Sequence, residues 1–151
     1  ISRLSQTGRI VRPIGFPMKR VRVLIVDRNP EVRRALAARL DSSRRIEVLT
    51  TAAGAREAFA QISALAPQVV VLDSKSLGQH PGASEIDELV RALRRLGPRI
   101  IVLATFSDES ERRAYLQAGV NRYLLKDIDS AALIAAIAEV AAEQILPAQR
   151  E

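Results

Sequence analysis

The sequence contains no cysteine and no tryptophan, and it has a single histidine. Without cysteine, neither a disulfide framework nor a thiolate metal site can form. His80 lies beside Pro81 in a polar segment, which is typical of a solvated loop residue and does not fit Ser-His-Asp chemistry. Apolar runs are about four to six residues long, against the roughly twenty that span a membrane. No signal peptide pattern begins the chain. We therefore expect a soluble, cytoplasmic protein without membrane contact.

Acidic residues are missing from the start of the chain. Lysine and arginine number 23 and aspartate and glutamate 17, which gives a net charge of +6. The first 22 residues hold six basic residues and no acid, so the remaining 17 basic and 17 acidic residues balance. We interpret residues 1–18 as a basic, mostly disordered extension or a vector remnant, with a phosphate-gripping arm as the alternative. The neutral body predicts no direct nucleic-acid contact by the domain.

After this extension, strand and helix patterns alternate five times. Each apolar strand pattern is followed by a helical one, such as the helix that begins at Asn29-Pro30 with Val32, Leu36 and Leu40 on one face. Short connections between strands and helices imply right-handed crossovers and a parallel sheet. We predict an α/β fold with a doubly wound, five-stranded parallel sheet in the order 2-1-3-4-5 and helices on both faces, flavodoxin-like. The predicted strands are 21–26, 46–51, 68–73, 99–105 and 121–125.

Three predicted strands each end at a charged residue: Asp27, Asp73 and Lys126. The carboxyl ends of parallel strands meet at one edge of the sheet, where ligands bind. Two carboxylates at close range repel each other unless a divalent cation or a basic side chain offsets their charge. Such a site suits an aspartate that accepts a phosphoryl group, with a cation and a lysine neutralising the oxygens. The alternative is that the aspartates cap loops and pair with Lys126.

Glycine is absent from the turn after the first strand, Asp27-Arg28-Asn29-Pro30. This turn lacks the glycines of a dinucleotide-binding unit and the Ser/Thr-rich phosphate cradle of a flavodoxin. The chain also contains no Gly-Lys-Ser/Thr triplet, so no P-loop is present. A flavodoxin-like module that binds a small molecule is the third functional alternative.

Three segments at the strand ends carry recognisable motifs. They are Val23-Leu24-Ile25-Val26-Asp27-Arg28-Asn29-Pro30, Pro67-Gln68-Val69-Val70-Val71-Leu72-Asp73 and Ala118-Gly119-Val120-Asn121-Arg122-Tyr123-Leu124-Leu125-Lys126-Asp127. With them the chain resembles, over roughly residues 20–145, the receiver domain of bacterial response regulators. The segment Leu103-Ala104-Thr105-Phe106 most resembles the subgroup with LuxR-type helix-turn-helix output domains. We assign residues 19–146 to the receiver domain and residues 147–151 to a tail or linker.

The resemblance implies a signalling domain that is not itself an enzyme. A histidine kinase would transfer a phosphoryl group to Asp73, with Mg²⁺ held by Asp27 and Asp73 and with Lys126 contacting the phosphoryl oxygens. A hydroxyl on the fourth strand would then move toward the phosphate, and Tyr123 would change its rotamer. The alternative for Tyr123 is that it only packs.

Two positions depart from the family's pattern. Arg28 stands where a second, metal-binding acid is usual, and Ala104 stands where the family has a switch serine or threonine. Thr105 is adjacent, but neighbouring strand residues point to opposite faces, so we expect it to be a poor replacement. We predict that Arg28, helped by Lys75, pairs with Asp27 and Asp73 and mimics the bound cation.

Two functions follow from these departures. The first is an atypical receiver with weak or absent Mg²⁺ binding, which acts through contacts with a histidine kinase or another signalling protein. The alternative is a working phosphoacceptor receiver, with Arg28 in solvent, from a LuxR-type transcription regulator. No helix-turn-helix pattern fits within the residues given.

The last predicted helix is apolar on nearly every side. We assign Ile134, Ile137 and Ala141 to the core, which leaves Leu133, Ala136 and Val140 on the exposed side. This pattern predicts a homodimer through the last helix. The alternative is that the alanines reflect helix propensity alone.

Overall fold

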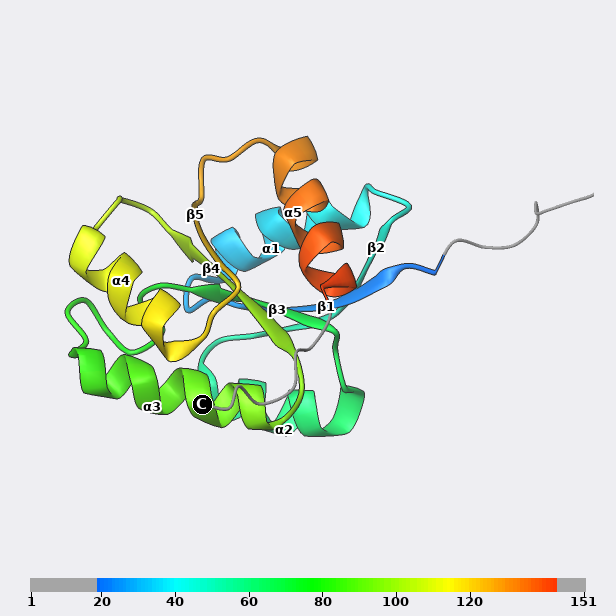
Figure 1. Ribbon diagram of the computed structural model, residues 1–151. Helices are drawn as coiled ribbons and strands as arrows, with labels where there is room; N and C mark the ends of the chain where they lie inside the picture. The colour runs from blue at the N-terminus through cyan, green and yellow to red at the C-terminus, as the bar shows by residue number, and fades with distance from the viewer. Residues whose placement is uncertain (1–18, 144–151) are drawn as a thin grey trace, which may run out of the picture.

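The computed structural model describes residues 19–143. Five strands and five helices alternate within this range (Figure 1). The predicted extension over residues 1–18, the end of the domain at residues 144–146 and the tail at residues 147–151 lie outside the described residues. In chain order the elements are β1 (Val21–Val26), α1 (Pro30–Asp41), β2 (Ile46–Ala52), α2 (Ala55–Leu65), β3 (Val69–Asp73), α3 (Ala83–Arg95), β4 (Arg99–Ala104), α4 (Glu109–Ala118), β5 (Arg122–Leu125) and α5 (Ser130–Ala142).

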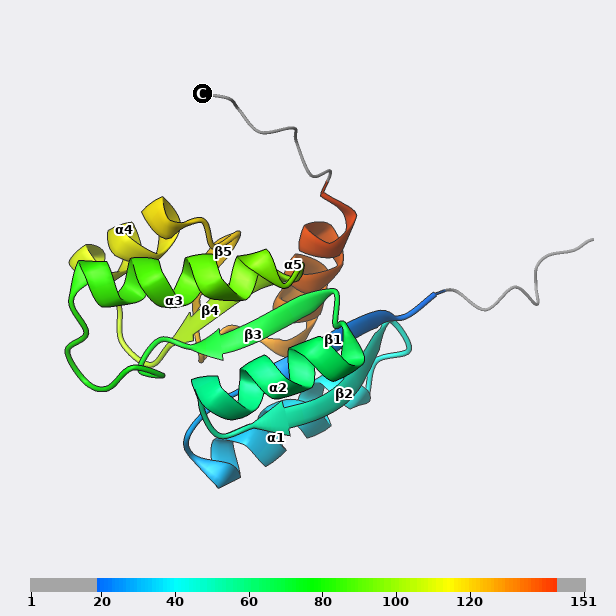
Figure 2. The same cartoon turned by 90° about the horizontal axis from the view of Figure 1, so that it is seen from below.

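The strands form one parallel sheet in the order β2-β1-β3-β4-β5, which confirms the predicted fold class and strand order. Helices cover both faces: α1 and α5 lie on one side, and α2, α3 and α4 on the other (Figures 1 and 2). Successive residues of β1 alternate between the two apolar cores, with Val23 facing α1 and α5 and Leu24 facing α2 and α3. This explains why the strand is a continuous apolar run, since both of its faces are buried.

The predicted caps fix the starts of three helices. The Asn29 side chain accepts hydrogen bonds from the backbone N–H groups of Glu31 and Val32, and the Asp108 and Asp129 side chains do the same for α4 and α5. The sequence pattern favours Ser84 as the cap of α3, and the structure differs. Gly82 is the cap, and its N–H donates to Glu85 Oε1 (2.8 Å), because a glutamate in the first turn can reach back to the cap's amide.

The buried stripe of α5 differs from the prediction. Leu133, Ile137 and Val140 are fully buried, whereas Ile134 and Ala141 pack only partly against the core. Placing Leu133 and Val140 on the exposed side was therefore wrong. The i, i+4, i+7 spacing of these large side chains buries more apolar surface against the sheet than the predicted stripe would.

Among residues 19–143, none of the helices combines the length and apolar character that crossing a membrane requires.

Candidate functional site

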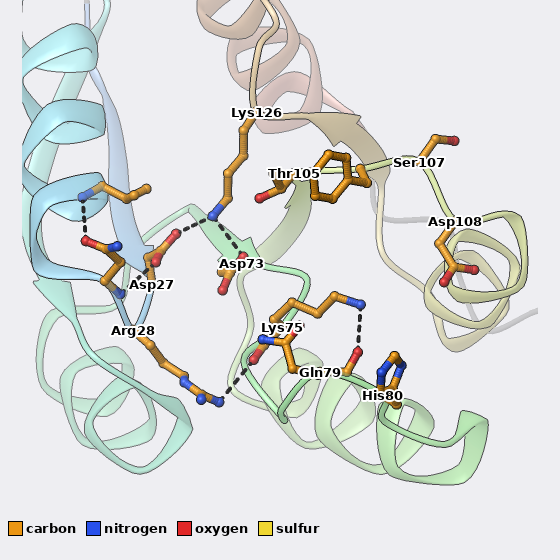
Figure 3. Close-up of a pocket in the computed structure, with 13 residues that line it drawn as sticks. Asp27, Arg28, Asp73, Lys75, Gln79, His80, Thr105, Ser107, Asp108 and Lys126 are labelled. Atoms are coloured by element: carbon orange, nitrogen blue, oxygen red, sulfur yellow. Dashed lines mark hydrogen bonds and ion pairs between the residues drawn. The ribbon is translucent and has the colours of Figure 1, made fainter.

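A pocket of about 530 Å³ opens at the carboxyl edge of the sheet. It is lined by the loops that follow β1, β3 and β4 and by Lys126, which follows β5 (Figure 3). Asp27, Asp73 and Lys126 all line it, so the structure brings together the three charged strand ends singled out in the sequence. This placement follows from the parallel sheet, because its strands deliver their last residues to the same edge.

Lys126 forms ion pairs with both of the pocket's buried carboxylates, and its single positive charge offsets one of their two negative charges. Its Nζ lies 2.7 Å from Asp27 Oδ2 and 3.0 Å from Asp73 Oδ1. The aspartate side chains are only 4% and 9% exposed. Burial by itself lowers the pKa of Lys126, but the hydrogen bonds to Asp27 and Asp73 outweigh burial, and the pKa is raised above its ordinary value. The ammonium therefore stays charged, and it satisfies both carboxylates at once.

Asp27 is held by its own turn as well. Its Oδ1 accepts a hydrogen bond from the Asn29 N–H (2.9 Å), and its carbonyl oxygen accepts one from Arg33 Nη1 (2.7 Å). Because Asn29 also caps α1, the start of that helix fixes the position of the carboxylate.

Arg28 does not pair with the aspartates. Its side chain is exposed and turns toward the loop after β3, where Nη1 lies 3.4 Å from the carbonyl oxygen of Lys75 (Figure 3). The predicted pairing of Arg28 and Lys75 with Asp27 and Asp73 is therefore wrong. Lys126 already pairs with both carboxylates, and the ammonium of Lys75 pairs instead with Glu111 at 2.7 Å.

The pocket contains two carboxylates that could hold Mg²⁺, those of Asp27 and Asp73. Mg²⁺ prefers octahedral coordination by oxygen and is usually held through carboxylates. Here the carboxylates of Asp27 and Asp73 are both bound to Lys126, and Arg28 stands beside them in the sequence position of a third acid. Within the described range, 19–143, the acidic and histidine side chains form no group of three that could hold a metal ion.

The end of β4 supplies a hydroxyl at a place that was not expected. Ala104 is buried, and its carbonyl oxygen accepts a hydrogen bond from the Lys126 N–H (2.8 Å). Thr105 is exposed, lines the pocket and points toward the Lys126 ammonium (Figure 3). Strand alternation does not govern Thr105, because β4 ends at Ala104. The argument that it would face away from the site was therefore wrong.

Sequence reasoning missed a second charged cluster beside the pocket. Glu111 on α4 is only 7% exposed. Its Oε1 accepts a hydrogen bond from the Tyr123 hydroxyl (2.6 Å), and its Oε2 accepts one from Lys75 Nζ (2.7 Å). Burial and the hydrogen bond to Glu111 raise the pKa of Tyr123, so its phenol stays protonated and donates. A signal was present in the sequence, since Glu111 shares the buried i, i+4, i+7 face of α4 with Tyr115 and Ala118.

Comparison with known proteins identifies the class to which this fold and site belong. The model of the response regulator receiver domain matches residues 23–138, and the chain belongs to this family. The transcriptional regulatory protein LiaR of Bacillus subtilis is 33% identical over 117 residues, which cover 78% of this chain and 54% of LiaR. The DNA-binding transcriptional activator DevR/DosR of Mycobacterium tuberculosis is 31% identical, covering 83% of this chain and 57% of that protein.

Solved structures agree with this assignment. The signal receiver domain of the putative response regulator NarL from Mycobacterium tuberculosis superposes with a TM-score of 0.72 at 26% identity, covering 84% of this chain and all of that chain. The predicted resemblance to the LuxR-type subgroup is confirmed. The chain spans about half the length of curated relatives such as LiaR and DevR/DosR. Receiver domains are generally not enzymes themselves.

Proposed function

We propose that this chain is an atypical receiver domain, in which Mg²⁺-dependent phosphorylation of Asp73 is weak and regulation proceeds mainly through protein contacts. The observation that carries the proposal is the charge arrangement of the pocket. Lys126 pairs with Asp27 and Asp73 and offsets one of their two negative charges, and the Arg28 guanidinium adds a positive charge where a third acid is usual. A receiver with this arrangement is close to charge balance before any cation enters.

Magnitudes support this reading. Exchanging a carboxylate for the Arg28 guanidinium changes the local charge by about two units. A pair of unit charges at ~4 Å interacts by on the order of 4 kcal/mol at an effective dielectric constant near 20. Arg28 is exposed, so solvent reduces this energy severalfold. The remainder still opposes a divalent cation, and the cation also loses a ligand.

A phosphoacceptor receiver is the second candidate, and two observations favour it. Arg28 makes no contact with Asp73, and Thr105 places a hydroxyl in the pocket. In either case we propose that this chain is cytoplasmic, that its partner is a histidine kinase or another signalling protein, and that its output is transcription regulation. LiaR and DevR/DosR, both named as transcription regulators, are the basis for this output.

We also propose self-association through α5, over a less apolar surface than the sequence predicts. Because Leu133 and Val140 are buried in the core, the exposed side of α5 consists largely of alanines such as Ala131, Ala132 and Ala142. A dimer through this side would need close helix packing. Gel filtration with light scattering tests it, and a monomer at high protein concentration would remove this part of the proposal.

Phosphorylation assays separate the two candidates. The wild type, Arg28→Asp and Asp73→Asn proteins are incubated with Mg²⁺ and a small phosphodonor, and their intact masses are measured over time. We expect little adduct on the wild type, a faster adduct on Arg28→Asp, and none on Asp73→Asn. Ready accumulation on the wild type that is lost in Asp73→Asn would reject the atypical reading and favour the phosphoacceptor.

A further inference from the structure

Glu111 joins two parts of the molecule that make no hydrogen bond to each other. Tyr123 comes from β5, while Lys75 lies in the loop after β3, two residues beyond Asp73. Each carboxylate oxygen receives one of these donors. A buried carboxylate needs such partners, because burial otherwise disfavours its charge. The position of the Tyr123 hydroxyl therefore depends on a carboxylate whose counter-charge is Lys75.

Lys75 lines the pocket, so an anionic group bound there would compete with Glu111 for the Lys75 ammonium. The residue lines the pocket and also an adjoining cavity of about 150 Å³, which Glu111 and His80 line as well. Its side chain is 34% exposed, and Nζ also donates to the Gln79 carbonyl oxygen (2.8 Å). Figure 3 shows this side chain extended along the pocket toward Gln79. An anionic group that enters the pocket thus meets an ammonium already engaged with Glu111.

The position on β4 that would carry a switch hydroxyl has none. Ala104 is buried and carries only a methyl group. A hydrogen-bonded path from the pocket to the Tyr123 hydroxyl runs through Lys75 and Glu111, at 2.7 Å and 2.6 Å, beside the ring contact between Tyr123 and Tyr115.

We propose that Lys75 is the positioning residue through which negative charge in the pocket controls Tyr123. While Lys75 pairs with Glu111, the carboxylate stays buried and holds the Tyr123 hydroxyl. When an anionic group in the pocket attracts Lys75, Glu111 loses its counter-charge, turns toward solvent and releases Tyr123. The inference rests on the proposed function in one respect, that the Asp27–Asp73 pocket receives the signal.

Tyrosine ring resonances report this link directly. The chain contains two tyrosines, Tyr115 and Tyr123, so ¹³C-ring labelling gives two sets of NMR signals that a Tyr123→Phe variant assigns. We expect Lys75→Met to shift or broaden the Tyr123 signals more strongly than those of Tyr115, whose hydroxyl donates to Ser74 O and whose ring lies 6.1 Å from that of Tyr123. Neutralising the carboxylate removes the need for a counter-charge, so the double variant Lys75→Met/Glu111→Gln should return Tyr123 toward its wild-type signals.

The controls keep this test decisive. Arg91→Met breaks an exposed ion pair with Asp87 on α3 and should leave both tyrosines unchanged. If Lys75→Met does not fold, Lys75→Gln replaces it in both variants. Unchanged Tyr123 signals in the Lys75 variant, or no recovery in the double variant, would overturn the proposal.

A charge placed in the pocket tests the direction of control. Thr105→Glu adds a carboxylate to the pocket lining, and Gln117→Glu adds one on the exposed side of α4 outside it. We expect only Thr105→Glu to move the Tyr123 signals, and we expect its effect to disappear in a Lys75→Met background. An unmoved Tyr123 in Thr105→Glu would reject control by the pocket. These experiments use no Mg²⁺ and no phosphodonor, so their failure is distinguishable from failure of the proposed function.

Discussion

Basic side chains have different partners at the carboxyl edge and at the amino edge of the sheet. At the carboxyl edge, Lys126 is bound by two buried carboxylates inside a pocket. At the amino edge, arginines donate to backbone carbonyls at the ends of helices: Arg22 to Leu65 and Ala66 at the end of α2, and Arg99 to Ala141 and Glu143 at the end of α5. Helix ends leave such carbonyls without intrahelical partners, so these arginines complete the fold. The carboxyl edge concentrates charge that can respond to a ligand, whereas the amino edge anchors helices.

Removing Lys126 should have the largest effect on stability. Lys126→Met leaves Asp27 and Asp73 buried without their counter-charge, and we expect a loss of about 2–3 kcal/mol in the free energy of unfolding. Urea denaturation at pH 7 measures it. Because the pKa of Lys126 is raised in the folded state, its contribution is fully present below the unfolded pKa and is lost only as pH rises through the folded value.

A matched comparison sharpens this result. The double variant Lys126→Met/Asp27→Asn removes one of the two carboxylate charges left without a counter-charge and should recover part of the lost stability. If Lys126→Met alone were as stable as the wild type, the pocket would not depend on this pairing.

Arg99 should have a smaller effect, confined to the other edge. Arg99→Ala removes the donors to the Ala141 and Glu143 carbonyl oxygens, and we expect a loss of about 1–2 kcal/mol. Denaturation measures the loss, and amide chemical shifts around Asp73 should stay as in the wild type. Shifts at the pocket as large as those at α5 would contradict the separation of the two edges.

Glu143 should have the smallest effect, and one that depends on pH. The hydrogen bond from Asn121 and the ion pair with Arg122 (2.7 Å) lower the pKa of Glu143 and outweigh its partial desolvation. A lowered folded pKa means that the stabilisation is present above the unfolded pKa and is lost as pH falls through the folded value. Wild type should therefore exceed Glu143→Gln in stability at pH 7, by a margin that vanishes in strong acid. A margin that is the same at both pH values would contradict this pairing.

The sequence predicts the fold and the meeting of the strand ends, because both follow from periodicity and from the geometry of parallel strands. Asp27, Asp73 and Lys126 needed no further information, since each lies at the carboxyl end of a strand. The contacts of the Arg28 side chain could not be predicted in this way, because Arg28 lies in a loop and its possible partners come close to it only in the folded chain. The Lys75–Glu111 pair could not be predicted for the same reason, because its members are 36 residues apart and belong to different elements. The α5 stripe was misplaced because the helix is apolar on several sides, and packing against the sheet selects which side is buried.

A guanidinium in place of an acid should suppress Mg²⁺ binding, and a Mg²⁺ titration measures this suppression. Amide chemical shifts of Asp27 and Asp73 are followed in wild type and in Arg28→Asp. The account predicts that Arg28→Asp binds Mg²⁺ at least about tenfold more tightly, which corresponds to about 1.4 kcal/mol or more. Equal affinity in the two proteins, with saturation of the wild type at the same Mg²⁺ concentration, would contradict it.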